Sequence, residues 1–541
     1  MRARSVPRRV AGGLVAGVVF ALALQSAGAW AQTANFDDRP SGFLSARTGG
    51  MPADGWKGTT LGTAKHLVSA LPAAPRSRAL RDLQFKVMVS DLQPPGNDGS
   101  ALPSLFARKV ERLAAMGEGE SLNEMVRGAG GFVDPFIATT VANALMLAGE
   151  RDGGCAVVRG SPMTEPFGRR ADIACRVVNS DIGGAQAAVA ALRGSDPAFA
   201  LLVDQATGVV QPGPATLTAI DGPAMMMLDV AFVSPPPAIL RSTQPSLMRS
   251  LVALKSLPLP TRLDVAERGE MLAIVEATRL GDLYVEAVRD RVPLPQGMAR
   301  RAQLVAQARN AASPADVMSS VSTIYSEMRG NPLFSTVARA SAVGLLNLPA
   351  QPQYANIAQE AIRGFLLLGD KQLTQAWTKL AVNAAYNNAR AMNALDRLMP
   401  LIAIAGIDNP RSLPAEEVNR WFDVMRQDDP QRAGLRGNLL LELFRATGID
   451  IPARGTELPE APPANARLVS LPPATLQALQ SAGQGRRRAE AALLATAAVG
   501  ETPLVDLHPA SVGAIVRALR EVGEDQAARL FAIETAIAHG L

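Results

Sequence analysis

The chain contains two cysteines, Cys155 and Cys175, and these are the first residues to consider for chemistry. Three arrangements are open to them: a structural disulfide, a redox pair or part of a metal site. Redox pairs usually have the spacing Cys-x-x-Cys, in which a helix N-terminus lowers the pKa of one thiol. A zinc site needs four ligands, and no histidine lies nearby in the sequence. If the protein is exported to an oxidising compartment, we expect Cys155 and Cys175 to form one disulfide.

Other residue types that carry out catalysis are scattered along the sequence. The histidines His66, His508 and His539 lie far apart, and none belongs to an H-E-x-x-H pattern. His508 precedes a proline at an expected helix start, which favours a capping or surface role. The chain has neither a G-x-S-x-G nor a G-x-x-x-x-G-K-[ST] motif. The sequence therefore predicts no catalytic residues, no cofactor, no metal site and no enzymatic activity.

One alternative is an enzyme that acts on peptidoglycan or another envelope polymer. Soluble lytic transglycosylases join an exported α-superhelix to a lysozyme-like domain with a catalytic glutamate. The pair Glu120-Ser121 resembles a dipeptide of such sites, but the companion Gly-Leu-Met-Gln-type segment is missing. A catalytic glutamate also needs a desolvating cleft that raises its pKa. Glu120 falls in a short polar break between helices, where we expect its carboxyl group to stay ionised.

A second alternative is a protein that holds an apolar ligand between its helices. Residues Met225–Val233 form a methionine-rich apolar run between proline-rich flanks. Methionine side chains are flexible and adapt to irregular ligands, so this run is a candidate pocket lining. Ordinary core packing is the simpler interpretation, in which the run forms a short buried helix.

The N-terminus has the pattern of a secretory signal peptide. Arginines occupy positions 2, 4, 8 and 9, an uncharged apolar run extends from Val10 to about Leu24, and Ala29 and Ala31 occupy the positions that a signal peptidase reads. We expect cleavage between Ala31 and Gln32, which places the mature protein in the periplasm. The apolar run is shorter than the roughly 20 residues needed to span a bilayer, so we expect no stable membrane insertion.

Removal of this segment changes the charge of the protein. The whole chain has a formal net charge of +5 and a pI near 9.4. Four of its arginines and no acidic residue lie in residues 1–31, so the mature chain is close to +1. Nucleic-acid binding requires a clustered basic face, which this balance does not provide. We therefore expect no nucleic-acid partner.

The composition predicts an all-α fold. Hydrophobic residues make up 48% of the chain and aromatic residues 4%, so alanine, leucine and valine supply most of the apolar surface. Alanine and leucine are strong helix formers. Helix signals are also local: Asp134 followed by Pro135 predicts a capped helix start. In residues 102–116 an apolar stripe includes Lys109, which we expect to contribute only its aliphatic stem.

The N-terminal signals and two proline-rich stretches divide the chain into seven segments. Paired helices with short connections are the unit of helical repeat proteins, and stacking buries a core that no single pair could bury. We therefore predict helical-hairpin repeats that form a curved α-solenoid with Pro-rich breaks. The expected segments are a signal peptide (1–31), a disordered leader (32–60), an N-terminal helical region with the cysteine hairpin (61–208), a Pro-rich connector (209–240), central helical repeats (241–448), a Pro-rich linker (449–474) and C-terminal helical hairpins (475–541).

Residues 353–406 show the clearest repeat-like pattern and weakly resemble tetratricopeptide hairpins. Ala376 and Ala381 occupy positions where such hairpins place small residues at a helix crossing. Trp377 is the expected large side chain between the two helices.

Three segments, residues 155–194, 375–406 and 507–541, resemble a group of exported, alanine-rich proteobacterial proteins often called "antifreeze glycopeptide polyprotein". The resemblance extends over roughly residues 60–541. Ice binding generally uses flat arrays of repeated Thr-x-Thr, and this chain has no repeated array of that kind. The group has no established activity, so the resemblance assigns no functional residues.

These observations lead to one expected function. Stacked helix pairs present a long surface suited to protein partners, and arginine, which is favoured in interfaces, is far more abundant here than lysine. We expect a non-catalytic periplasmic scaffold or adaptor that joins envelope proteins in a secretion, motility or cell-wall machine.

Overall fold

The computed structural model describes residue 37 and residues 41–100, 103–132, 134–386, 388–407, 410–460 and 467–541. These residues form 27 α-helices and three short 3-10 helices, η2 (Ala46–Thr48), η3 (Pro352–Ile357) and η4 (Leu504–Asp506). In the described residues, extended backbone pairs only as isolated bridges. The predicted all-α class is therefore confirmed.

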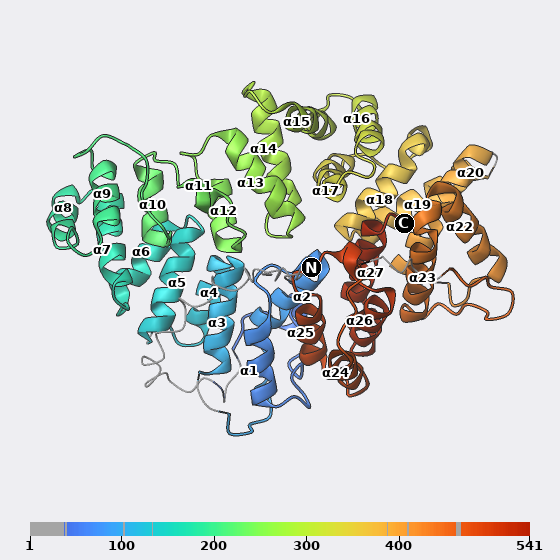
Figure 1. Cartoon of the computed structure of the whole chain (residues 1–541), viewed down its shortest axis with the longest axis horizontal. Coiled ribbons are helices and arrows are strands. Elements are labelled where there is room, and N and C mark those ends of the chain that lie inside the picture. Colours follow the sequence, from blue (N-terminus) through green and yellow to red (C-terminus); the bar gives the residue numbers. More distant parts are fainter. Residues whose placement is uncertain are drawn as a thin grey trace, which may run out of the picture.

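Most helices follow one another through short connections (Figure 1). The first group is α1 (Leu61–Ala70), α2 (Arg78–Val89), α3 (Leu105–Met116), α4 (Gly119–Gly128), α5 (Pro135–Leu147), α6 (Arg151–Gly160), α7 (Phe167–Val178), α8 (Ile182–Ala190), α9 (Pro197–Ala206) and α10 (Gly222–Val230). The second group is α11 (Pro237–Leu240), α12 (Pro245–Ala253), α13 (Leu259–Met271), α14 (Ala277–Arg289), α15 (Gln296–Asn310), α16 (Pro314–Glu327) and α17 (Phe334–Leu345).

The C-terminal part continues in the same way. Its helices are α18 (Ala358–Leu368), α19 (Lys371–Ala385), α20 (Ala389–Asp396), α21 (Met399–Ala405), α22 (Ala415–Asp428), α23 (Pro430–Ala446), α24 (Pro473–Gln484), α25 (Arg488–Val499), α26 (Pro509–Glu521) and α27 (Asp525–Ala538). Within the described part of the chain, no helix is long and apolar enough to cross a bilayer.

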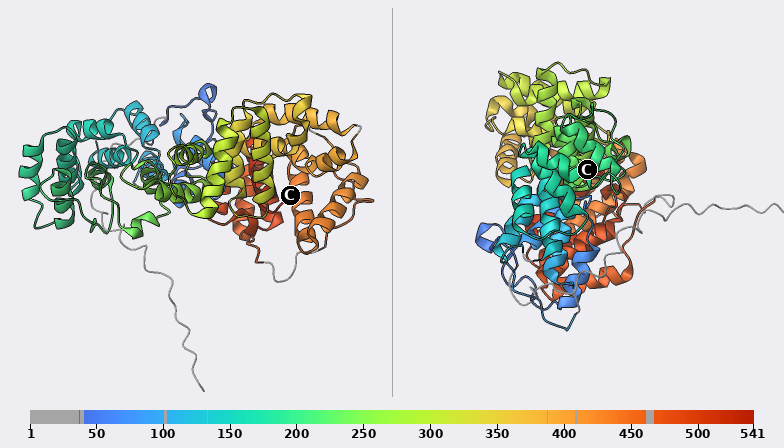
Figure 2. Two further views of the ribbon diagram at one scale, coloured as in Figure 1. Left: turned by 90° about the horizontal axis from the view of Figure 1, so that it is seen from above. Right: turned by 90° about the vertical axis from the view of Figure 1, so that its left-hand side faces the viewer.

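Most helices pack against their neighbours in sequence, as in α5 with α6, α14 with α15 and α18 with α19. This pattern is compatible with the predicted hairpin repeats. Figure 2 shows that the molecule is elongated, with α8 near one end and the α20–α22 region near the other. One continuous apolar core runs through nearly all of the helices.

The C-terminal helices return to the N-terminal ones. Helix α25 packs against α1 and α2, and α27 packs against α2, α18 and α21. Figure 1 shows this closure, with α25 and α27 beside α1 and α2 near the centre of the view. A simple linear array, in which each unit touches only its neighbours, would leave both ends open. Here residues more than 400 positions apart share one core, since the Thr59 hydroxyl donates to the Glu490 carboxylate at 2.9 Å.

The expectation of a disordered leader is wrong for residues 41–60. Met51 and Trp56 in this segment are buried in the main core. The Met51 amide donates to the Ser90 hydroxyl at 2.7 Å, and the Gly55 carbonyl accepts from the Ala489 amide at 2.9 Å. The composition misled the prediction because two large apolar side chains and a few backbone hydrogen bonds are enough to hold this segment between α2 and α25.

The Pro-rich connector also contributes to the core. Residues 222–230 form α10, which confirms the expected short buried helix, and α10 packs against α5, α7 and α9. Its three consecutive methionines, Met225, Met226 and Met227, are all buried in the main core. This position matches the core-packing interpretation of the methionine-rich run.

Helix starts follow local sequence signals. The Asp134 carboxylate accepts hydrogen bonds from the amides of Phe136 and Ile137, so the predicted cap of α5 is confirmed. Asp370 caps α19 in the same way, through the Leu373 amide. Part of the predicted 449–474 linker is ordered too: Asp450 bridges to Ser412, and Val469 bridges to Leu507.

Candidate functional site

The two cysteines lie on consecutive helices, Cys155 on α6 and Cys175 on α7. They form a disulfide, with their Cα atoms 5.6 Å apart. The expected pairing is confirmed, and the bond closes a loop of 20 residues. Both cysteines are buried in the core, so the bond joins two packed helices at a distance from solvent.

The predicted helix crossing at residues 376–381 is correct for two residues and wrong for the third. Trp377 is fully buried between α18 and α19, with its ring centroid 6.5 Å from that of Phe365, and Ala381 is buried one turn further on. Ala376 is exposed, because it precedes Trp377 by one position and points about 100° away around the helix.

The remaining candidate residues from the sequence do not form a site in the part of the chain that the structure describes. Glu120 lies in the first turn of α4 with an exposed side chain, and it lines neither of the two pockets described below. Ala31 and Gln32, the expected cleavage site, lie outside the described residues. Among the described residues, no cluster of three or more histidine, cysteine, aspartate or glutamate side chains is arranged to hold a metal ion.

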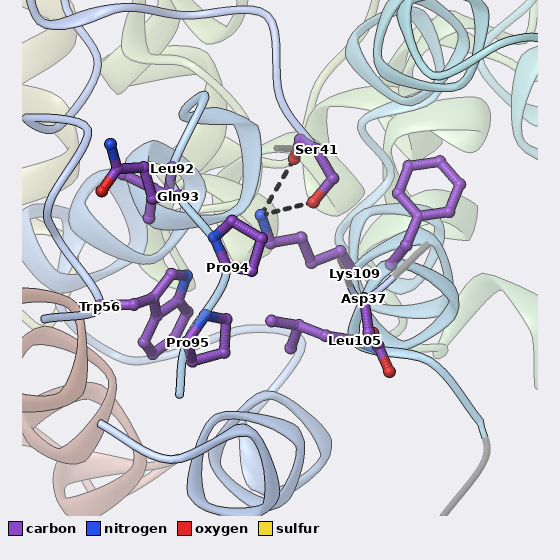
Figure 3. A pocket seen from close by; sticks show the side chains of 10 residues that line it. Asp37, Ser41, Trp56, Leu92, Gln93, Pro94, Pro95, Leu105 and Lys109 are labelled. Atoms are coloured by element: carbon purple, nitrogen blue, oxygen red, sulfur yellow. Dashed lines mark hydrogen bonds between the residues drawn. The ribbon is translucent and has the colours of Figure 1, made fainter. Parts of the chain in front are cut away.

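The least expected titratable group is Lys109 on α3 (Figure 3). Its side chain is almost completely buried, and its ammonium group donates to the Ser41 carbonyl at 3.0 Å and to the Ser41 hydroxyl at 3.3 Å. Burial lowers the pKa of Lys109 to about 8. The void beside it is only about 10 Å³, which is roughly the space of one water molecule. Lys109 therefore has no room for a substrate, and it anchors residue 41 to α3.

A buried carboxylate, Glu270 near the C-terminal end of α13, links the N-terminal helix α2 to the middle of the chain. Arg339 on α17 donates to its two oxygens at 2.6 and 2.9 Å, and Arg78 on α2 donates to it at 2.9 Å. Burial alone would raise the pKa of Glu270, but the charges of Arg339 and Arg78 hold it below its ordinary value. This triad joins three helices that are far apart in the sequence.

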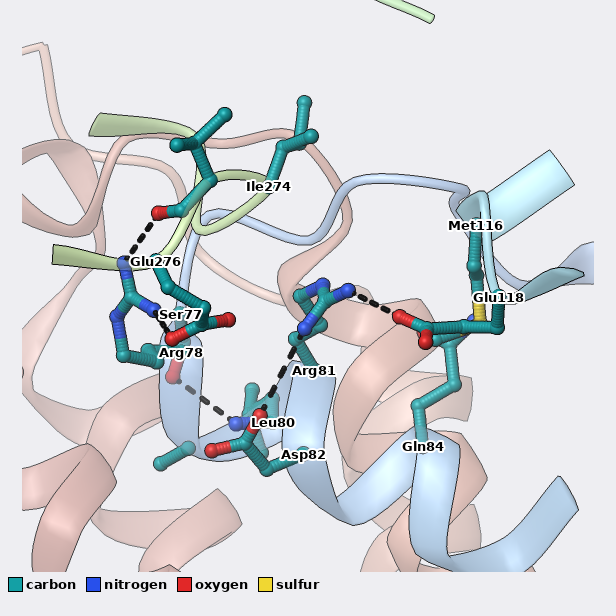
Figure 4. A network of polar contacts seen from close by, with 12 residues as sticks. Ser77, Arg78, Leu80, Arg81, Asp82, Gln84, Met116, Glu118, Ile274 and Glu276 are labelled. Atoms are coloured by element: carbon teal, nitrogen blue, oxygen red, sulfur yellow. Dashed lines mark hydrogen bonds and ion pairs between the residues drawn. The ribbon is translucent and has the colours of Figure 1, made fainter. Parts of the chain in front are cut away.

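A second carboxylate, Glu118 in the α3–α4 turn, makes a similar link. It accepts from Arg81 on α2 and from Arg249 on α12, the latter at 2.9 Å. Figure 4 shows Arg78 and Arg81 on neighbouring turns of α2, with Arg78 directed toward Glu276 and Arg81 toward Glu118. The N-terminal helix α2 thus contacts the α12–α13 region through two separate ion-pair groups.

Helix α27 completes this polar cluster. The Glu534 carboxyl group accepts from the Ser77 hydroxyl at 2.5 Å and from the Ala79 amide at 3.2 Å, both at the start of α2. Burial raises the pKa of Glu534 above its ordinary value, although the Ser77 hydrogen bond opposes this shift. All of these polar groups serve contacts between helices.

A larger pocket lies between α18, α19, α21 and α27. Its volume is about 280 Å³. The apolar lining is Phe365, Leu366, Ala405, Ile407, Leu530 and Ile533, and the polar lining is Asp370, Lys371, Thr374, Asp525, Gln526 and Arg529. No sequence signal pointed to this pocket, because its walls come from segments more than 100 positions apart.

A comparison with known protein families, with curated proteins and with solved structures finds no match for this chain.

Proposed function

We propose that this protein is an exported, non-catalytic helical scaffold or adaptor that holds protein partners together in the bacterial envelope. The observation that carries this proposal is the buried Arg78–Glu270–Arg339 triad, which links the N-terminal helix α2 to α13 and α17 in the middle of the chain. An adaptor must keep its binding surfaces at fixed relative positions, and separating helices that share a buried ion pair is costly because it leaves a charge without its partner.

The distribution of charged groups supports the same proposal. Enzymes usually collect titratable groups with shifted pKa values in a cleft where substrate can enter. Here the strongly buried charges of Glu270, Arg339 and Lys109 are in contacts between segments of the chain. The signal-like N-terminus and the arginine-rich composition, both read from the sequence, favour an envelope location and protein partners.

Crosslinking and affinity capture of the mature protein from its native envelope test the proposal. We expect one stoichiometric complex, recovered by the wild-type protein and by Glu276→Ala. Glu270→Ala should lose most of it, because this variant removes the carboxylate that Arg78 and Arg339 share. Glu276 is the matched control, since it contacts the same Arg78 but has a side chain 59% exposed, against 0% for Glu270.

Two results would contradict the proposal. One is recovery of the protein alone under conditions that preserve other envelope complexes. The other is lytic activity on a peptidoglycan zymogram that disappears in Glu120→Gln, because this would establish the enzyme alternative.

A further inference from the structure

The pocket between α18, α19, α21 and α27 has the size of a ligand site. A cavity of about 150 Å³ in another protein is known to accept benzene, which has six carbon atoms. At about 280 Å³ this pocket is nearly twice as large, so it has room for about eleven non-hydrogen atoms. Its lining residues belong in part to α18, α19 and α27, which lie beside the C-terminus in Figure 1.

The interior of the pocket is apolar. Phe365, Leu366 and Ile533 are buried side chains that face this space without filling it. Leu530 and Ala405, which are partly buried, extend the apolar wall. An aliphatic or compact aromatic body would bury apolar surface against these residues, which is the main source of affinity in such pockets.

The acidic groups of the lining already have partners within the protein. Asp370 caps α19 by accepting from the Leu373 amide at 2.9 Å. Asp525 accepts from Arg520 and from Arg529, both at 2.8 Å. A cationic ligand would therefore have to compete with existing hydrogen bonds for either carboxylate.

The basic side of the lining is different. Within the described residues, the ammonium group of Lys371 makes no hydrogen bond or ion pair, and its side chain is exposed at the pocket mouth. Arg529 is held in place by Asp525 and by the Ile404 carbonyl at 2.8 Å, so its charge is already paired within the lining. Lys371 is therefore the charged group of this lining to which the described residues offer no partner.

We propose that this pocket binds a small amphiphilic carboxylate, with an apolar body of about eight to ten carbons inside the pocket and its carboxylate at Lys371. The inference is independent of the scaffold proposal, because it concerns a different surface and a different class of ligand. Lys371 acts as an exposed ion-pair partner, so it contributes selectivity, and the apolar lining contributes most of the affinity.

Isothermal titration calorimetry of the mature protein with hexanoate, octanoate and decanoate tests whether the apolar chain of the ligand occupies the pocket. Each added methylene should tighten binding about fourfold until the pocket is full. Ala405→Phe places a ring in the pocket and should weaken octanoate binding at least tenfold. Leu530→Trp is a second filling variant with the same expected effect, and the helical circular-dichroism spectrum of each variant verifies folding.

Heptanol and heptyltrimethylammonium, which carry the same seven-carbon chain as octanoate, test the charge. Octanoate should bind several-fold more tightly than either, and Lys371→Met should weaken octanoate binding about three- to fivefold without changing the affinity for heptanol. Lys379→Met, an exposed lysine two turns further along α19 and outside the pocket lining, is the matched control and should change nothing.

The proposal is overturned if octanoate shows no saturable binding below its micelle concentration. It is also overturned if folded Ala405→Phe and Leu530→Trp bind as tightly as the wild type, since the ligand would then lie elsewhere. Equal or tighter binding of the neutral or cationic probe would refute the carboxylate assignment.

Discussion

Arg339 on α17 binds both carboxylate oxygens of Glu270 near the end of α13, at 2.6 and 2.9 Å. Glu270 has no solvent exposure, and its second cation, Arg78, comes from α2, 192 positions earlier in the sequence. Three segments that are separated by at least 69 positions therefore meet at one carboxylate. The packing of α2, α13 and α17 should accordingly depend on Glu270 more than on any exposed ion pair.

Glu270→Ala should destabilise the protein by about 3–5 kcal/mol, because it leaves the buried Arg339 guanidinium without its ion-pair partner and Arg78 with only the exposed Glu276. Glu276→Ala, which removes the exposed partner of the same Arg78, should cost about 0–1 kcal/mol. Urea unfolding followed by circular dichroism measures both. Similar losses for the two variants would contradict the central role of Glu270.

The triple variant Arg78→Met, Glu270→Leu, Arg339→Met separates charge from packing. Replacing a whole buried ion group by apolar side chains is often neutral or stabilising, whereas removing one member is strongly destabilising. We therefore expect the triple variant to be more stable than Glu270→Ala in the same urea titration. If it is less stable, packing geometry and not the uncompensated charge explains the loss.

His539 should make the protein sensitive to mild acid. Its side chain is buried, and burial lowers its pKa from 6.5 to about 4. The unfolded chain binds a proton below pH 6.5 while the folded protein does not, so stability is complete above pH 6.5 and falls as the pH drops toward 4. The loss should be about 3 kcal/mol at most.

The melting temperature, measured from pH 7.5 to pH 4, tests this effect. His539→Gln should show a shallower decline than the wild type over this range. His66→Gln changes an exposed histidine on α1 and serves as the matched control, with the wild-type slope expected. A wild-type slope in His539→Gln would exclude His539 as the source.

Lys109 should make the stability of the protein depend on pH in the alkaline range as well. Burial lowers its pKa from 10.5 to about 8, so the folded protein releases this proton before the unfolded chain does. Its contribution to stability should therefore rise between pH 8 and pH 10.5, by about 3 kcal/mol at most. Lys109→Met should lack this rise, and Lys57→Met, at an exposed position, should retain it. Urea titrations at pH 7.5, 9 and 10 measure the difference.

The Cys155–Cys175 disulfide should stabilise the protein through the 20-residue loop that it closes. The loop-entropy estimate is about 3 kcal/mol. Reduced wild type and the double variant Cys155→Ala, Cys175→Ala should both lose about this amount, and hydrogen exchange should accelerate first in α6 and α7. Iodoacetamide should label neither cysteine in unreduced, unfolded protein. Labelling of both would show that the bond is absent.

The sequence by itself determined the local features of this protein. Three of these features depend on residues close in sequence: the all-α class, the cap at Asp134 and the short buried helix at Met225. The pairing of Cys155 with Cys175 follows because neither cysteine has any other cysteine to pair with. Such features are encoded by propensity, periodicity and spacing, which a single sequence displays directly.

Only the tertiary structure decided which distant residues meet. Three features depend on neighbours that the local sequence pattern does not specify: the order in residues 41–60, the burial of the Lys109 ammonium group and the exposure of Ala376. The Glu270 triad and the pocket beside Lys371 are assembled from helices that are far apart in the sequence. An arginine that pairs across a core looks the same in a sequence as an arginine on the surface, because the difference lies in the long-range packing that removes it from water.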